Sequence, residues 1–174
     1  MARRGGRLPV FADAPAFREL TPQRRVKSEL RAIAGDAERR ARFESELERA
    51  LAAGPHNKIA RLVQAHWSEA LGDPRGAMRQ LEALAGEYPD FYDGQSDLGK
   101  MLLADGDPES AARHFARAAR LIPDSPQAWN NLGVAQWQSG DPAGAKRSFE
   151  RALKHDPDLR EAKDNLEALA AARR

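Results

Sequence analysis

Three copies of Gly-Asp-Pro, at Gly72-Asp73-Pro74, Gly106-Asp107-Pro108 and Gly140-Asp141-Pro142, recur at one constant spacing along the chain. Glycine adopts the left-handed backbone conformation that ends a helix. The aspartate that follows can cap the next helix through its side chain, and proline fits the first helical position. Each copy therefore predicts a tight turn between two helices, and the constant spacing predicts a repeated helical hairpin.

Further positions keep the period of the Gly-Asp-Pro copies. One series consists of prolines that end the second helix of each hairpin, and two series carry small or apolar side chains. Two antiparallel helices of about 12–14 residues and their turns account for one period of about 34 residues. The three series are Pro55, Pro89, Pro123 and Pro157; Phe43, Ala77, Ala111 and Ala145; and Leu47, Leu81, Phe115 and Phe149.

The composition favours helices and excludes several classes of protein. The 174 residues include 33 alanines, no cysteine and only 6% aromatic residues. A large sheet, a disulfide scaffold, thiol catalysis and cysteine metal sites are therefore not expected. The net charge of +2 does not indicate a protein whose whole surface binds nucleic acid. The excess of arginine (22) over lysine (6) is typical of a GC-rich bacterial genome.

Neither a membrane segment nor an export signal is evident in the sequence. Residues 1–7 are basic, but no apolar run follows them as a secretory signal would require. No apolar stretch is long enough to span a bilayer. We therefore expect a cytoplasmic protein.

Two periods carry a pattern known from one family. Trp129-x-x-Leu132-Gly133 is followed by Ala145-x-x-x-Phe149 and Pro157, and Leu98-Gly99, Ala111-x-x-x-Phe115 and Pro123 repeat it. This pattern resembles that of the tetratricopeptide repeat family, W-x2-L-G-x2-Y…A-x3-F…P. The resemblance implies an all-α fold, a right-handed solenoid of helical hairpins. It also implies that Gly99 and Gly133 let the paired helix approach closely, opposite Ala111 and Ala145.

The sequence departs from the family pattern at several places. Gln95 stands where the family has tryptophan, and Leu102 and Gln136 stand where it has tyrosine. Trp137 could supply the aromatic bulk that is missing at position 136. In 24–57 the turn Gly35-Asp36 comes three residues early, which predicts a short first helix and a long second one.

These patterns divide the chain into an arm, four hairpins and a cap. The cap helix is expected from the apolar stripe Leu159, Ala162, Leu166 and Leu169. The segment 24–57 is either a degenerate repeat or a plain pair of capping helices. The expected divisions are a basic flexible arm at 1–23, the degenerate hairpin at 24–57, repeats at 58–91 (with a degenerate first helix), 92–125 and 126–159, and the C-terminal capping helix at 160–174.

No motif predicts catalysis. Gly94-x-x-x-x-Gly99-Lys100 has phosphate-loop spacing, but Met101 stands where serine or threonine should hold magnesium. The acids of 105–109 lack the twelve-residue spacing of a calcium loop. We therefore expect no enzyme, no metal and no cofactor.

The resemblance instead implies a binding surface. In this family the first helix of each pair lines a concave groove that holds an extended peptide or a partner helix. Asn131 and Asn165 lie one period apart and should follow one another along it, so that their amides either pair with a peptide backbone or are solvated. Trp137 either holds an apolar or cationic ligand side chain or packs within the hairpin. The groove candidates are Asp93, Asp97, Lys100, Gln127, Asn130, Asn131, Val134, Trp137, Asp164 and Asn165.

The charges of the groove candidates and of the arm limit the class of partner that the protein is expected to bind. Lys100 is the only cation among the groove candidates and has Asp93 and Asp97 nearby, which favours a basic or mixed segment over an acidic C-terminal tail. Residues 1–31 carry eight Lys/Arg and three acids, a net charge of +5. The arm could dock on an acidic surface, including nucleic acid, or be a solvated tail. We expect a protein-interaction module, with a nucleic-acid-associated factor as the alternative.

Overall fold

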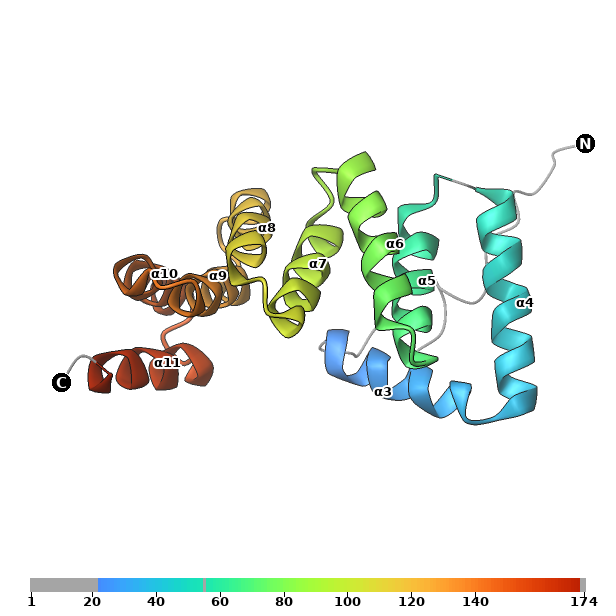
Figure 1. The fold of residues 1–174 in the computed structure, drawn as a ribbon, viewed down its shortest axis with the longest axis horizontal. Coiled ribbons are helices and arrows are strands. Elements are labelled where there is room, and N and C mark those ends of the chain that lie inside the picture. The colour runs from blue at the N-terminus through green and yellow to red at the C-terminus, as the bar shows by residue number, and fades with distance from the viewer. Residues whose placement is uncertain (1–21, 55, 173–174) are drawn as a thin grey trace, which may run out of the picture. The chain divides into compact units, whose positions relative to one another are not determined.

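The computed structural model describes residues 22–54 and 56–172, and all regular structure in those ranges is helical (Figure 1). This confirms the all-α fold. Residues 1–21 of the predicted arm lie outside the described residues. The last two residues of the predicted arm belong to the first helix, which begins at Pro22. The helices are α3 (Pro22–Ala34), α4 (Ala37–Ala53), α5 (Lys58–Ala70), α6 (Pro74–Glu87), α7 (Tyr92–Asp105), α8 (Pro108–Leu121), α9 (Pro126–Gln138), α10 (Pro142–His155) and α11 (Arg160–Ala171).

The three Gly-Asp-Pro turns have the predicted geometry. Their glycines have φ values of 84°, 86° and 84°, which is the left-handed region that favours glycine. The aspartate Oδ1 atoms accept from backbone N–H groups three residues on, at 2.8 Å from Gly76, 2.9 Å from Ser110 and 2.8 Å from Gly144. The prolines begin α6, α8 and α10. Local chemistry thus sets the helix boundaries.

The mid-helix glycines lie directly against phenylalanine rings of the paired helix. A Cβ on Gly99 would lie 2.8 Å from Cε1 of Phe115, and one on Gly133 would lie 2.5 Å from Cε1 of Phe149. Both rings are fully buried. The glycines therefore make room for the largest core side chains of the partner helix, and Ala111 and Ala145 on the same partner helices are also fully buried.

The chain divides into two compact units, the first ending at Gln80 and the second being Leu81–Arg174. In the first unit, Leu30, Phe43, Leu47 and Trp67 form one apolar cluster. The rings of Phe43 and Trp67 lie 4.6 Å apart between centroids, and Lys27 pairs with Glu69 at 2.8 Å. These contacts join α3, α4 and α5.

One prediction for this unit is wrong. Helix α4 is long, with 17 residues, but α3 has 13 and is not short. It begins at Pro22, two residues before the expected start of the hairpin. Proline is favoured at the first helical position, so Pro22 itself marked this start.

In the second unit, each helix packs against its neighbours in sequence: α7 on α8, α8 on α9, α9 on α10, and α10 on α11. Phe115 and Phe149 lie at the centre of the successive pairs. Helix α11 buries Ala162 and Leu169, and Leu169 joins Ala145 and Phe149 in one cluster. This burial supports the predicted role of α11 in covering the last hairpin. None of the helices described in the structure is long and apolar enough to cross a membrane.

Candidate functional site

The groove candidates on α7 include a buried ion pair. Asp97 is only 5% exposed, and Lys100 Nζ lies 3.0 Å from its Oδ1. Lys100 is itself partly buried. Asp97 and Lys100 therefore largely neutralise each other, and the carboxylate of Asp97 contributes more to the helix packing than to an open surface. Asp93 lies one turn earlier on the same helix and is partly exposed.

The candidates on α9 and α11 meet through two amides. Asn165 Nδ2 donates to Asn130 Oδ1 at 3.0 Å, so the partner of Asn165 is Asn130 and not Asn131. This bond uses one donor of Asn165 and one acceptor of Asn130, and each amide has further capacity. Asn131, which follows Asn130 in the sequence, is partly exposed, and Asp164 and Gln127 are exposed. That Asn131 and Asn165 follow one another along a groove stays a prediction.

Val134 and Trp137 contribute to packing. Both are partly buried and pack on the cluster of Ala145, Phe149 and Leu169. Of the two possibilities for Trp137, the structure shows contact within the last hairpin and with the cap. These side chains support the position of α11, which carries Asp164 and Asn165.

The position of the missing tryptophan holds a network that sequence reasoning did not find. Gln95 is fully buried, and its Nε2 donates to the carbonyl oxygens of Ala85 at 3.1 Å and Pro89 at 3.3 Å. Its Oε1 lies 2.8 Å from Nδ1 of His114. Since the two carbonyls can only accept, the amide orientation is fixed, and His114 must donate from Nδ1.

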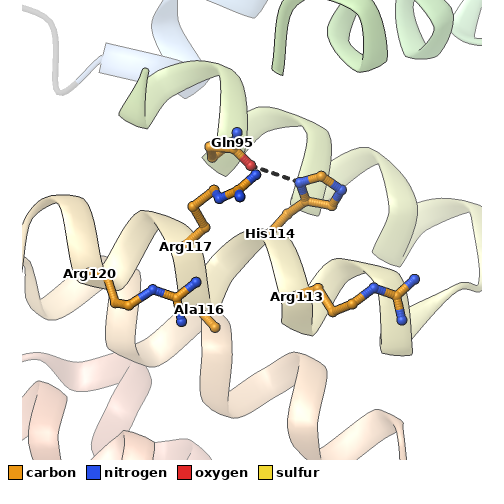
Figure 2. Close-up of a pocket in the computed structure, with 6 residues that line it drawn as sticks. All are labelled: Gln95, Arg113, His114, Ala116, Arg117 and Arg120. Carbon is orange, nitrogen blue, oxygen red and sulfur yellow. Dashed lines mark hydrogen bonds between the residues drawn. The ribbon is translucent and has the colours of Figure 1, made fainter. Parts of the chain in front are cut away.

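Beside this network lies a cavity of about 430 Å³, lined by Gln95, Arg113, His114, Ala116, Arg117 and Arg120 (Figure 2). Burial, followed by the charges of Arg113 and Arg117, lowers the pKa of His114, while Glu82 on α6 acts in the opposite direction. The three arginines, at spacings of four and three residues, share one face of α8. That spacing is visible in the sequence, but the opening beside Gln95 is not.

The described residues show neither a metal site nor a nucleotide site. Within residues 22–54 and 56–172, no three histidine or acidic side chains come together as metal ligands. The stretch with phosphate-loop spacing lies wholly inside α7, so its backbone N–H groups are not arranged around a phosphate.

The comparisons with known proteins agree with this architecture. A tetratricopeptide repeat model matches residues 68–126, 96–159 and 130–174, which together cover more than half of the chain. The chain belongs to the tetratricopeptide repeat family. The match begins at residue 68, so whether 24–57 is a tetratricopeptide repeat stays a prediction. A comparison with curated proteins gives no match.

Solved tetratricopeptide structures share the fold. The Pseudomonas aeruginosa pilF protein has 19% identity and a TM-score of 0.67, over 86% of this chain and 69% of its own. The first tetratricopeptide domain of Spaghetti (RPAP3), bound to the HSP90 peptide SRMEEVD, has 16% identity and a TM-score of 0.62, over 66% and 91%. The Yersinia enterocolitica type III secretion chaperone SycD, in complex with a peptide of the translocator YopD, has 17% identity and a TM-score of 0.58, over 66% and 92%.

Proposed function

We propose that the protein is a cytoplasmic interaction module that holds an extended peptide or a helix of a partner protein against α7, α9 and α11. Two proteins of the same fold were solved with peptides bound. Helix α8 packs against both α7 and α9, and α10 packs against α9 and α11. The first helices of successive pairs are thus held in order by the second ones, which favours a preformed binding surface.

The observation that carries this proposal is the hydrogen bond between Asn130 and Asn165. It fixes two amides from different helices at one place, beside Asn131. Amides that both donate and accept suit the repeating N–H and C=O groups of a peptide backbone. Fixing them in advance lowers the entropy that a ligand must overcome on binding.

The charges of this surface favour a basic or mixed ligand segment. The Asp97–Lys100 pair leaves no net charge, whereas Asp164 is exposed on α11 beside Asn165. A cationic side chain of the ligand would find a carboxylate there. Binding is achieved by shape and hydrogen bonding, and we infer no chemical step.

The test is a quantitative affinity capture from cell extract with the intact chain as bait. The variant N131A/N165A removes two groove amides and should lose the groove partners. The control K146A/E150A changes two exposed side chains of α10 and should keep them. A third bait that lacks residues 1–20 identifies partners of the arm.

The outcomes separate the two candidate functions. Partners that the asparagine variant loses and the control keeps support the groove. If every partner survives in N131A/N165A and disappears with residues 1–20, the groove proposal is wrong and the arm is the binding element. Strong loss of those arm partners between low and moderate salt would then indicate phosphate contacts, as the nucleic-acid alternative requires.

A further inference from the structure

We propose that the cavity formed by α8 and the start of α7 is a second binding site, which takes an acidic segment of a partner protein. It is separate from the surface of α7, α9 and α11 described above. Its lining has three arginines, one histidine and no acidic side chain. Its volume of about 430 Å³ falls in the range of about 300–1,000 Å³ usual for ligand sites.

The next repeat shows why the cavity exists. Gln95 and Trp129 occupy the same position in successive repeats. In the repeat of α9 and α10, the guanidinium of Arg151 lies 4.0 Å from the ring centroid of Trp129. Arg151 is the counterpart of Arg117. Because the Gln95 amide is smaller than an indole, the place beside Arg117 is open.

Helix α8 also lacks the acidic residue that α10 has at the equivalent position. Ala116 lies in the cavity wall, whereas its counterpart on α10 is Glu150, which pairs with Lys146 at 3.6 Å. Arg117 and Arg120 make no ion pair with any residue that the structure describes. Arg117 and Arg120 are exposed at the mouth of the cavity. Arginines without an ion-pair partner favour an anionic ligand, because their planar donors match carboxylate geometry.

The arrangement of the side chains indicates which residues of the cavity would contact the ligand. Figure 2 shows Arg117 extending toward Gln95 and Arg120 lying beyond Ala116, while Arg113 extends the other way. Arg113 donates from Nη2 to Ser110 Oγ at 2.7 Å. His114, Arg117 and Arg120 therefore form the centre of the site and Arg113 its edge. Over this length of α8, one small anion cannot reach every guanidinium, so a segment with several carboxylates fits best.

The net charge of residues 32–174 favours a short acidic peptide over a long polyanion as the ligand. Residues 32–174 carry 20 Lys/Arg and 23 Asp/Glu, a net charge of −3. A nucleic acid that extends beyond the cavity would meet this excess of acid, whereas a short segment stays within a lining that holds no acidic side chain.

His114 makes the site sensitive to pH. His114 donates a hydrogen bond from Nδ1 to Gln95 Oε1, so an added proton goes to Nε2 and turns His114 into a cation. Burial and the neighbouring arginines disfavour that charge, and Glu82 favours it. An anion in the cavity offsets the arginine charges and raises the pKa of His114. Binding is then coupled to proton uptake, and affinity falls as the pH rises.

The experiment is a titration of the full-length protein with a fluorescein-labelled peptide of alternating Glu and Gly, at low ionic strength and pH 6.5. R117Q/R120Q should weaken binding about tenfold or more, since charge-assisted bonds are lost. The control R147Q/K154Q removes two charges of α10 that are exposed like Arg117 and Arg120 but lie outside the cavity lining, and it should bind within about twofold of the unchanged protein. Helix content by circular dichroism confirms that both variants fold.

Two further arms complete the test. Affinity should be higher at pH 6 than at pH 8, and H114N, whose side-chain amide can still donate to Gln95, should remove most of this difference. The proposal is overturned if the peptide does not bind, if both double variants lose affinity equally, or if the pH dependence survives in H114N. It is also overturned if a single-stranded oligonucleotide binds this site more tightly than the peptide does and loses affinity in R117Q/R120Q.

Discussion

The ring of Phe149 occupies the space that a side chain at position 133 would need, since a Cβ on Gly133 would lie 2.5 Å from its Cε1 atom. Phe149 is fully buried and packs with Ala145 and Leu169. Gly133 and Phe149 thus depend on each other, although they belong to different helices, α9 and α10.

The first prediction compares two glycines that both lie inside helices. G133A should destabilise the protein by about 1–3 kcal/mol, because overpacking outweighs the better helix propensity of alanine. G86A, in α6, adds a Cβ with no atom within 4 Å, and should stabilise by up to about 1 kcal/mol. Urea unfolding of both variants measures this. Equal stabilisation by the two changes would contradict the role of the Phe149 ring.

The second prediction concerns the buried amide. Q95M keeps the approximate volume but leaves His114 Nδ1 and the carbonyls of Ala85 and Pro89 without their partner. We expect a loss of about 2–3 kcal/mol in the free energy of unfolding, because buried polar groups are costly when unpaired. The exposed Gln127 provides the control, since Q127M should change stability by less than about 0.5 kcal/mol. Thermal and urea unfolding that show equal effects would mean that the network does not stabilise the fold.

The third prediction concerns pH. Hydrogen bonds from the side chain and the backbone N–H of Ser110 lower the pKa of Asp107. A folded-state pKa below the unfolded one means that the stabilisation is complete above the ordinary aspartate pKa, near about 4. It is lost as the pH falls through the lowered value of the folded state.

Asparagine caps helices about as well as aspartate but does not titrate in this range. The stability of the unchanged protein relative to D107N should therefore decline on acidification below the ordinary aspartate pKa. Urea unfolding at a series of pH values measures the difference. Parallel curves for the two proteins would show that the Asp107 carboxylate adds no pH dependence.

The fourth prediction tests the cap helix. Leu169 is 3% exposed and joins the cluster of Ala145 and Phe149. L169A should cost about 2–4 kcal/mol, as truncation of a buried leucine leaves a cavity. Hydrogen exchange should show lost protection in α11 and then in α10. E167A, at an exposed position of the same helix, should leave the exchange of α10 unchanged. Unchanged protection in L169A would mean that α11 does not stabilise the last hairpin.

The turns could be predicted from the sequence because their chemistry is local. In Gly106-Asp107-Pro108 the conformation of one residue, the side-chain acceptor of the next and the ring of the third act within a single turn. The constant spacing of Gly-Asp-Pro along the chain then located the remaining turns of this kind. The start of α3 was missed because no repeat column crosses Pro22.

The cavity beside Gln95 could not be predicted in this way. A glutamine in place of tryptophan shows in the sequence, but its bonds to Ala85 and His114 depend on the packing of α6, α7 and α8. The same limit applies to Asn130 and Asn165. Their positions in the sequence differ by one more than the period, and the two amides meet through the contact between α11 and α9.

The three Gly-Asp-Pro turns also bear on how such a chain can grow. Each turn is stabilised within a span of a few residues, and none needs a contact from a distant repeat to hold its backbone. Duplication or deletion of one whole repeat would preserve every turn and restore the same packing between neighbours. The gene can therefore lengthen or shorten by whole units, and individual units, such as the one that carries Gln95, can diverge after copying without disturbing the register of the rest.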